Sequence, residues 1–308
     1  MKMKWRKLGR IFCASGEYPW MRTHAANPIA EPIHDSLVRI YFNCRDAENR
    51  SYVGWLVIDL RQSQEILELS TQPSLCPGPS GSFDDSGVSL GCLVPRGQET
   101  WLYYVGWNLG RTTPWRNSIG LAYRKIGSDG QPRFERFAQG PILDRDPFDP
   151  YNVSYPWVIH ESGLWKMWYG TNLTPTPVDL IDIPHAFKFA SSDDGVHWTR
   201  KHDRLCLGGA LAGDCAFTKP CVIRDADRYR MWYSHRGRTY QLGYAESHDG
   251  WNWTRYDERV GIAPSVDGWD SGSLSYPSIF DQGGQRYMLY NGPHYGASGF
   301  GLAVLEKG

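Results

Sequence analysis

One aromatic segment recurs five times along the chain, and this repetition constrains the fold more than any other feature. The copies are rich in Tyr, Trp, Phe and Met, residues that favour pleated strands, and each has the length of one strand. They are Arg39–Arg45, Trp101–Trp107, Leu164–Gly170, Arg228–Ser234 and Arg286–Asn291. A segment that recurs in this way predicts a repeat architecture in which every copy belongs to one supersecondary unit.

Two further strand-like segments flank each aromatic copy. The preceding segments are Pro28–Ile33, Val88–Val94, Pro156–Ile159, Pro220–Ile223 and Pro277–Phe280. The following segments are Tyr52–Leu60, Ile119–Arg124, Phe187–Ala190, Leu242–Ala245 and Phe300–Leu305. Pro156, Pro220 and Pro277 are 64 and 57 residues apart, which is enough chain for a four-stranded unit with long loops.

Turn residues predict a fourth, outer strand in these units. Ser192–Trp198 and Ser247–Trp253 each contain an Asp-Gly pair, which suits a tight hairpin, followed by a Trp. The last unit has only three such segments, whereas Lys4–Ile11 at the N-terminus resembles the outer strand that begins at Trp253. We therefore expect one all-β domain over residues 1–308, a single five-bladed β-propeller whose N-terminal strand completes the last blade.

Composition excludes several function classes. Lys plus Arg and Asp plus Glu are 33 each, so no basic excess is available to neutralise nucleic-acid phosphates. No apolar run approaches the ~20 residues that span a bilayer. Seven cysteines in irregular spacing contain no pair of CxxC units, which argues against a structural zinc site. We expect a cytoplasmic protein with free thiols, no cofactor, no metal and no membrane or nucleic-acid partner; the oligomeric state stays open.

Carboxylates recur in the loops that precede the first strand of each unit. Asp149, Asp214 and Asp270 lie seven, six and seven residues before Pro156, Pro220 and Pro277, and Asp85 lies five before Leu90. Symmetry would aim them at one centre, where crowded carboxylates separate acid and base roles. We predict Asp85, Asp214 and Asp270 as the catalytic acid and base, with Asp149 in reserve as a substrate contact. The structural alternative is that such Asp residues cap turns.

Basic, amide and aromatic side chains accompany these carboxylates at the same predicted strand ends. Lys219, His235 and Arg236 together could hold an anion, because guanidinium forks suit carboxylates and phosphates. The alternative for the arginines is a salt bridge between blades. The predicted substrate contacts are His24, Asn27, Arg45, Trp107, Arg116, Asn117, Asp149, Tyr155, Lys219, His235, Arg236, Tyr276 and Asn291.

The chain resembles the glycosidase superfamily of five-bladed propellers, which includes arabinanases, invertases and mannoside phosphorylases. The resemblance covers essentially the whole chain. Stretches typical of a poorly characterised bacterial branch are HAANP (24–28), FDDSG (83–87), RNSIGLA (116–122), GPILDRDP (140–147), YRMWYS (229–234), LGYAESHDG (242–250) and YMLYNG (287–292). Invertase-like members carry Asn-Asp-Pro in the first blade, where this chain has Ala26-Asn27-Pro28, and the Glu of other members has no counterpart in these loops.

The resemblance implies a carbohydrate-active enzyme that cleaves a glycosidic bond of a small-molecule or oligosaccharide substrate. The missing nucleophile motif argues against a retaining mechanism and leaves inversion or phosphorolysis open. Two alternatives remain: a biosynthetic isomerase, cyclase or lyase acting on a sugar-like metabolite, and a sugar-binding propeller without catalysis. Since one fold supports many functions, the site must decide among them.

Overall fold

The protein is built from β-strands and short turns. The computed structural model describes residues 2–175, 183–200, 204–208, 214 and 216–306. Helical structure in this part of the chain consists of three single 3₁₀ turns, which are η1 (Leu60–Gln62), η2 (Asp257–Arg259) and η3 (His294–Gly296). No described helix is long and apolar enough to cross a membrane.

The strands form five antiparallel units in chain order. Unit one contains β2 (Thr23–His34), β3 (Leu37–Arg45), β4 (Ser51–Asp59) and β5 (Ile66–Leu69). Unit two contains β6 (Gly87–Arg96), β7 (Glu99–Leu109), β8 (Trp115–Ile126) and β9 (Pro132–Arg136). A single parallel pairing, Ser51 with Gly87, joins these two units into one eight-stranded sheet.

The remaining units repeat the same order. Unit three contains β10 (Val153–Glu161), β11 (Leu164–Asn172), β12 (His185–Ser192) and β13 (Thr199–Arg200), and β14 (Leu207–Gly208) also pairs with β12. Unit four contains β15 (Ala216–Arg224), β16 (Tyr229–Arg236), β17 (Tyr240–Ser247) and β18 (Thr254–Arg255). Unit five contains β19 (Ser275–Gln282), β20 (Gln285–Asn291), β21 (Phe300–Leu305) and β1 (Trp5–Phe12).

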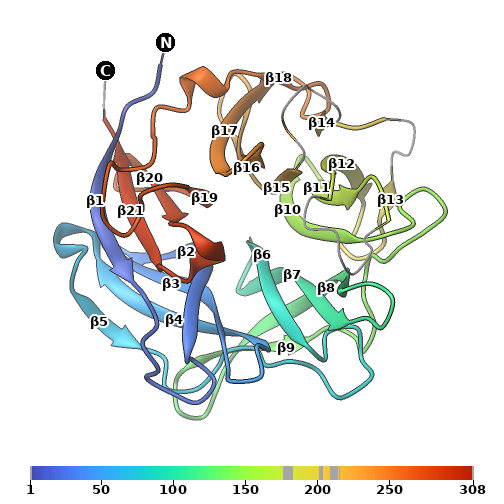
Figure 1. Ribbon diagram of the computed structural model, residues 1–308, viewed down its shortest axis with the longest axis horizontal. Helices are drawn as coiled ribbons and strands as arrows, with labels where there is room; N and C mark the ends of the chain where they lie inside the picture. The colour runs from blue at the N-terminus through green and yellow to red at the C-terminus, as the bar shows by residue number, and fades with distance from the viewer. Residues whose placement is uncertain (1, 176–182, 201–203, 209–213, 215, 307–308) are drawn as a thin grey trace.

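The N-terminal strand completes the last unit, as the sequence predicted. β1 runs antiparallel to β21 from the pair Trp5–Leu305 to the pair Phe12–Phe300, so it supplies the outer strand that the C-terminal segment lacks. Figure 1 shows β1 in blue beside β21 in red. This pairing covers the edge of β21, which would otherwise present unpaired backbone groups.

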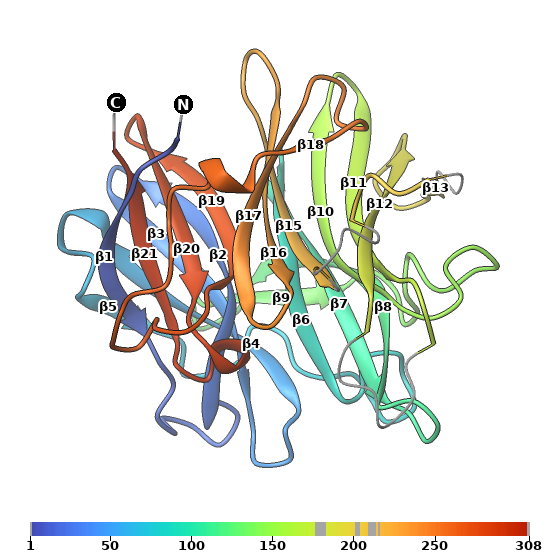
Figure 2. The same cartoon turned by 45° about the horizontal axis from the view of Figure 1, so that its top comes forward.

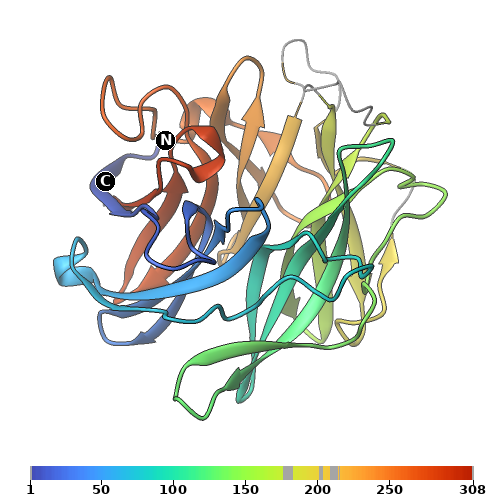
Figure 3. The ribbon, with the colours of Figure 1, turned by 60° about the horizontal axis from the view of Figure 1, so that its bottom comes forward.

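The five units surround one central axis. Figure 1 looks along this axis, and Figures 2 and 3 tilt it to show the units side by side. The innermost strands are β2, β6, β10, β15 and β19; each of them contacts the next, and β19 contacts β2. Side chains that leave these strands toward the axis therefore meet side chains from units that are not neighbours in the chain.

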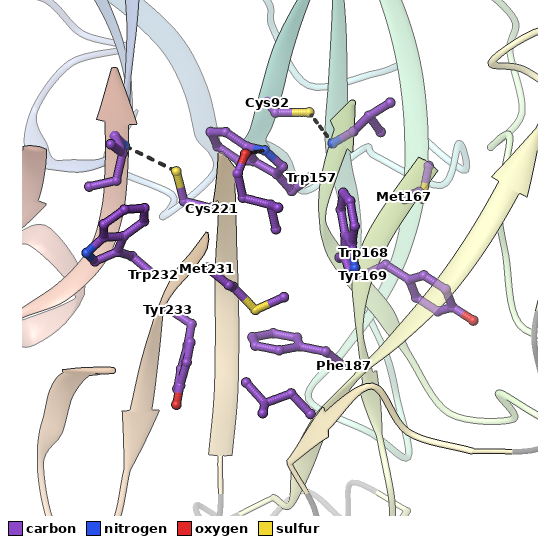
Figure 4. Packing of buried hydrophobic residues seen from close by; sticks show 14 of the residues in the cluster. Cys92, Trp157, Met167, Trp168, Tyr169, Phe187, Cys221, Met231, Trp232 and Tyr233 are labelled. Atoms are coloured by element: carbon purple, nitrogen blue, oxygen red, sulfur yellow. Dashed lines mark hydrogen bonds between the residues drawn. The ribbon is translucent and has the colours of Figure 1, made fainter. Parts of the chain in front are cut away.

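Aromatic side chains fill the spaces between neighbouring units. Trp168, Trp232, Tyr169, Tyr233 and Phe187 are completely buried in the largest core cluster, part of which Figure 4 shows. The recurring aromatic segments thus supply the core. Burying a large apolar side chain of this kind stabilises the fold by about 1.5–3 kcal/mol.

Buried thiols link two pairs of inner strands across this core. Cys92 Sγ accepts a hydrogen bond from the Val158 amide at 3.1 Å, and Cys221 Sγ accepts one from the Ile279 amide at 3.1 Å (Figure 4). Six of the seven cysteines lie in the described residues, and all six are free thiols. Cys215, the seventh, lies outside them.

Charged side chains link neighbouring units at the end opposite the start of the inner strands. Arg124 of unit two pairs with Glu31 of unit one, and Arg224 Nε of unit four lies 3.1 Å from Glu161 Oε1 of unit three. Arg286 Nη2 of unit five lies 2.7 Å from Asp225 Oδ1 of unit four. These contacts join neighbouring units at the end opposite the predicted site.

Candidate active site at the channel mouth

At the end where the inner strands begin, the strand register gives each unit one row of three paired residues, which we call a rung. In each unit the start of the inner strand lies beside the end of the second strand and the start of the third. The rungs are Thr23–Arg45–Ser51, Gly87–Trp107–Asn117, Val153–Thr171–Ala186, Ala216–Arg236–Tyr240 and Ser275–Asn291–Phe300. The predicted contacts Arg45, Trp107, Arg236 and Asn291 therefore all lie at this end, which we call the channel mouth.

A β-bulge interrupts each inner strand just inside the channel mouth. The residue before the bulge proline has a left-handed backbone in four units: Asn27 (φ 51°), Tyr155 (φ 43°), Lys219 (φ 54°) and Tyr276 (φ 55°). Such a conformation costs a residue with a Cβ about 1–3 kcal/mol and is concentrated at functional sites, and bulges re-aim side chains. Four strained residues at one level of the channel indicate that their side-chain direction matters.

In unit two the bulge has a glycine in place of a projecting side chain. A Cβ on Gly91 would lie 2.5 Å from the Tyr103 carbonyl oxygen and 2.8 Å from the Pro156 carbonyl oxygen, so only glycine fits there. Lys219 extends across the axis from unit four and donates to the carbonyl oxygens of Leu90 at 2.8 Å and Gly91 at 2.6 Å. The bulge of unit two thus receives a side chain from unit four.

Tyr155 and Tyr276 also meet across the axis. Their rings lie 5.9 Å apart and are stacked, although unit four separates units three and five. Tyr240 lies 6.4 Å from Tyr276, and Tyr295 lies 6.1 Å from Tyr240, so four phenols form one group. We call Tyr155, Tyr240, Tyr276 and Tyr295 the tyrosine cluster.

The central phenols remain protonated at neutral pH. Burial raises the pKa of Tyr155, and hydrogen bonds with Tyr276 and Asn27 and the positive charge of Arg45 oppose this only in part. Burial also raises the pKa of Tyr276 well above its usual value, and the neighbouring phenols raise it further. Both phenols therefore keep their hydroxyl hydrogen at pH 7, and each can donate a hydrogen bond.

Cationic groups surround the tyrosine cluster. Arg45 is half-buried, and its charge together with burial lowers the pKa of His24 to about 4. The Arg236 guanidinium lies 5.2 Å from the centre of the Tyr240 ring. Burial, and to a smaller extent the positive charge of Arg236, lower the pKa of His185 to about 4. Both histidines are consequently neutral at pH 7, and the charged groups that act on them are arginines.

Two polar atoms near this group are buried without a hydrogen-bond partner among the described residues. They are Oδ1 of Asn27, whose residue is 4% exposed, and Nδ1 of His185. Buried polar atoms in native proteins are nearly always satisfied by protein, water or ligand. A bound polar molecule at the channel mouth would satisfy them.

Three other predicted contacts stabilise the scaffold at this end. The side chain of Asn291 is completely buried; its Nδ2 donates to the Ala25 carbonyl oxygen at 2.6 Å and its Oδ1 accepts from the Asn27 amide at 3.0 Å. Trp107 Nε1 donates to Ser51 Oγ at 2.8 Å, and the backbone N–H of Asn117 donates to Asn152 Oδ1 at 2.8 Å. These bonds join neighbouring units beside the bulges. Arg116 lies one residue away, on the exposed rim.

The carboxylates of Asp149 and Asp270 are held by their own units. Asp149 is 0% exposed and accepts bonds from Tyr169 Oη at 2.8 Å, Thr171 Oγ1 at 2.7 Å and Lys188 Nζ at 2.8 Å. Asp270 is 3% exposed and lies 2.6 Å from Lys7 Nζ of β1. Although burial alone would raise the pKa of each carboxyl, these hydrogen bonds and charges hold both pKa values below the usual range.

Asp214 and His235 form a pair in unit four. Asp214 Oδ1 lies 3.1 Å from His235 Nδ1, and Arg255 Nη2 donates to Asp214 Oδ2 at 2.8 Å. His235 precedes Arg236 by one residue on β16, and successive strand side chains point to opposite faces. His235 accordingly contacts Asp214 and lines a cavity of about 290 Å³ with Asp257 and Glu258, so it is not grouped with the tyrosine cluster.

Asp85 caps the turn before β6. Its carboxyl oxygens accept bonds from the Gly81 amide at 2.9 Å and from Ser86 Oγ at 3.0 Å, and no ion pair to it occurs within the described residues. The equivalent of Asp149 and Asp270 in unit two is Asp84, which is 1% exposed and pairs with Arg136. The spacing argument selected the neighbouring residue because it counted from Leu90, whereas the bulge residue that corresponds to the prolines is Gly91, seven residues after Asp84.

The buried aspartates follow one rule that the sequence displays. In three units the Asp lies 20 residues before a Tyr of the second strand, and its carboxylate accepts a hydrogen bond from that Tyr hydroxyl. A basic residue of the outermost strand forms an ion pair with the same carboxylate. The aspartate–tyrosine pairs are Asp84–Tyr104, Asp149–Tyr169 and Asp270–Tyr290, and the basic residues are Arg136, Arg200 and Lys7. In unit four, Arg255 of the outer strand pairs with Asp214. These carboxylates tie the inner loop to the outer strand within each unit.

Sequence reasoning missed part of the channel-mouth group. Tyr240, Tyr295 and His185 were not predicted, since no repeat pattern marks them. A usable signal was position, because Tyr240 and His185 begin the third strands of their units. In the described part of the chain, no group of three or more His, Cys, Asp or Glu side chains is arranged to hold a metal ion.

Comparison with known proteins identifies close relatives over the full chain. Two proteins of Mycobacterium tuberculosis, the uncharacterized protein MT1551 of strain CDC 1551 / Oshkosh and the uncharacterized protein Rv1502 of strain H37Rv, are 47% identical over 305 residues. Each comparison covers 99% of this chain and 100% of the relative. No family model matches the chain.

Several solved structures with a similar fold are glycoside hydrolases of propeller type. A structure from the GH130 family of mannoside phosphorylases, which contains hydrolases that target β-1,2-mannosidic linkages in Candida mannan, gives a TM-score of 0.74 at 13% identity and covers 99% of this chain and 94% of its own. The α-L-arabinofuranosidase of Podospora anserina gives 0.69 at 9% identity, with 99% and 98% covered. The chain therefore belongs to the family of the two Mycobacterium tuberculosis proteins and has the fold of the propeller-type glycoside hydrolases.

Proposed function

We propose that the protein is carbohydrate-active and binds an anionic sugar at the channel mouth. The observation that carries this proposal is the group of strained side chains around the axis, in which phenol donors of the tyrosine cluster lie between Arg45 and Arg236. Arginine forks bind carboxylates and phosphates, and aromatic rings suit the apolar faces of sugar rings. The unsatisfied atoms of Asn27 and His185 add hydrogen-bonding capacity for hydroxyl groups.

The scaffold in this proposal is one five-bladed propeller over residues 1–308, closed by contact between β19 and β2. A closed ring explains why side chains of non-neighbouring units meet, as Tyr155 and Tyr276 do. The free thiols support a reducing compartment such as the cytoplasm. The ligand in this proposal is a small-molecule sugar or an oligosaccharide used in biosynthesis, because such sugars occur in that compartment.

A second candidate is hydrolysis by aspartate acid–base catalysis, which the solved structures of similar fold favour. Asp85 is its best remaining candidate because it has no ion pair in the described residues. Asp214 and Asp270 are weaker candidates, since an acid or base must exchange protons and both carboxylates are held by cations. This candidate predicts that Asp85→Asn, Asp214→Asn or Asp270→Asn abolishes turnover of a glycoside.

Calorimetric titration with three sugars tests the leading proposal. The ligands are galacturonate, galactose 6-phosphate and galactose, which separate a carboxylate, a phosphate and no charge on similar rings. Arg45→Gln should weaken binding of the charged sugars about 10- to 100-fold, because a hydrogen bond to a charged group contributes about 1.5–3 kcal/mol. Tyr276→Phe should weaken binding of all three.

Lys125→Gln is the matched control, since it also removes one positive charge but from an exposed position near the far end of β8. It should leave all affinities unchanged. The proposal is wrong if galactose binds as tightly as its charged analogues, or if Arg45→Gln and Lys125→Gln behave alike.

A further inference from the structure

A cavity lies on the rim of units two and three, beside the channel mouth. Its volume is about 310 Å³, and its lining includes Trp115, Arg116, Arg145, Tyr151 and Asn152. This volume is near the lower end of the range for small-molecule sites, about 300–1,000 Å³, and suits one sugar ring. Trp115 begins β8 and is 38% exposed, so part of this residue is accessible to a ligand.

Strand pairing and hydrogen bonds along β8 link the cavity wall to the channel mouth. Asn117 lies two residues after Trp115 and pairs with Trp107 on β7. The backbone N–H of Asn117 donates to the side chain of Asn152 in the cavity wall. Trp107 in turn donates to Ser51, which pairs with Arg45 at the channel mouth. A stripe of polar and aromatic groups therefore connects the two places.

The charge of the cavity is positive. Arg116 is exposed and has no ion pair in the described residues. Arg145 Nε lies 3.7 Å from Asp144 Oδ1, but both side chains are well exposed, at 38% and 46%, so water weakens this pair. Two guanidinium groups beside an exposed indole combine a planar apolar face with anion recognition.

We propose that this rim cavity is a second sugar subsite, which binds the next acidic residue of an oligosaccharide whose terminal sugar lies at the channel mouth. The inference rests on the proposed function and extends it from a single sugar to a chain. Linked contacts at two subsites raise affinity because the second sugar binds at a high effective concentration. The sugar at the rim stacks on Trp115, and its carboxylate binds Arg116 and Arg145.

Titration of oligogalacturonates with one to four residues tests this inference, with neutral manno-oligosaccharides of equal length for comparison. In the wild-type protein, affinity for the acidic series should rise at least about tenfold from one residue to two, and the neutral series should show a smaller rise. Trp115→Ala should remove the rise while the affinity for galacturonate stays unchanged. Arg116→Gln with Arg145→Gln should bring the acidic series to the level of the neutral one.

Phe137→Ala is the control for Trp115→Ala, because Phe137 is also a partly exposed aromatic residue (43%) but lies outside the cavity. It should leave the chain-length effect unchanged. The inference is overturned if affinity does not change with chain length, or if Trp115→Ala retains the rise. Longer chains that bind through Trp115 while galacturonate fails to bind would uphold the rim subsite and refute the channel-mouth proposal; no binding of any acidic sugar would refute both.

Discussion

Replacing Asp149 by Asn should destabilise the fold, because this carboxylate neutralises two buried cations. Lys188 Nζ lies 2.8 Å from Asp149 Oδ1, and Arg200 Nη1 lies 3.2 Å from Oδ2. The two basic side chains are only 8% and 9% exposed. Removing one partner of a buried ion pair costs about 3–5 kcal/mol, and here the cost comes mainly from Lys188, because Arg200 keeps an ion pair with Asp146 Oδ2 at 2.9 Å.

The size of the molecule converts this cost into a melting shift. An unfolding entropy of about 2.1 cal/mol/K per residue gives roughly 650 cal/mol/K for 308 residues, so 3–5 kcal/mol corresponds to a decrease of about 5–8 °C. Differential scanning calorimetry or a thermal melt by circular dichroism at pH 7 measures this decrease. Asp85→Asn is the matched control and should shift the melting temperature by less than about 2 °C, because Asp85 lacks an ion pair in the described chain.

The difference between wild type and Asp149→Asn should also depend on pH. The folded protein holds the pKa of Asp149 below its usual value, so the carboxylate contributes stability above about pH 4, and this contribution decreases as pH falls through the folded pKa. The two melting temperatures should therefore approach each other in acid. If Asp149→Asn melts within about 2 °C of the wild type at pH 7, Asp149 does not carry the structural role assigned to it.

Three further perturbations test other parts of the structure. Lys7→Met should lower the free energy of unfolding by about 2–4 kcal/mol in urea titration, because it leaves the buried Asp270 carboxylate without its cation; an unchanged unfolding midpoint would contradict the pairing of β1 with the last unit. His24 and His185 have pKa values of about 4 in the folded protein and near 6.5 when unfolded, so stability should fall as pH is lowered from about 6.5 to 4. His24→Asn should reduce that dependence, which pH-dependent melting would detect. Burial raises the pKa of Cys92 and Cys221 to about 12, so iodoacetamide at pH 8 should alkylate the exposed Cys76 and spare both buried thiols, and peptide mass spectrometry that found rapid labelling of Cys92 would show that the inner strands open.

The sequence was sufficient to predict the strands and the role of the N-terminus. The bounds of the second strands were predicted most closely. For example, the predicted strand Arg286–Asn291 corresponds to β20 (Gln285–Asn291). Inner strands start earlier than predicted, since β2 begins at Thr23 although Pro28 was taken as its first residue. The reason is that the strand continues upstream of the proline through a bulge, and a left-handed residue before proline leaves no mark in a hydrophobic pattern.

The candidate site was predictable only in part. Arg45, Tyr155, Tyr276 and Arg236 follow from equivalent positions in the repeat, and the structure groups their side chains around the axis. The spacing argument could not assign the role of the aspartates, because a symmetric array of carboxylates at a strand start can equally be a symmetric array of structural ion pairs. Distinguishing the two requires the position of the outer-strand cations, which the fold determines.

A crystal structure of the protein with galacturonate is the most direct test of the central claim that an anionic sugar binds at the channel mouth. We predict electron density for the sugar beside Tyr155 and Tyr276, with its carboxylate about 2.7–3.2 Å from a guanidinium nitrogen of Arg45 or Arg236. Density at Asp85 and away from both arginines, or no density at a saturating concentration, would contradict the claim. The first of those results would favour acid–base hydrolysis by Asp85.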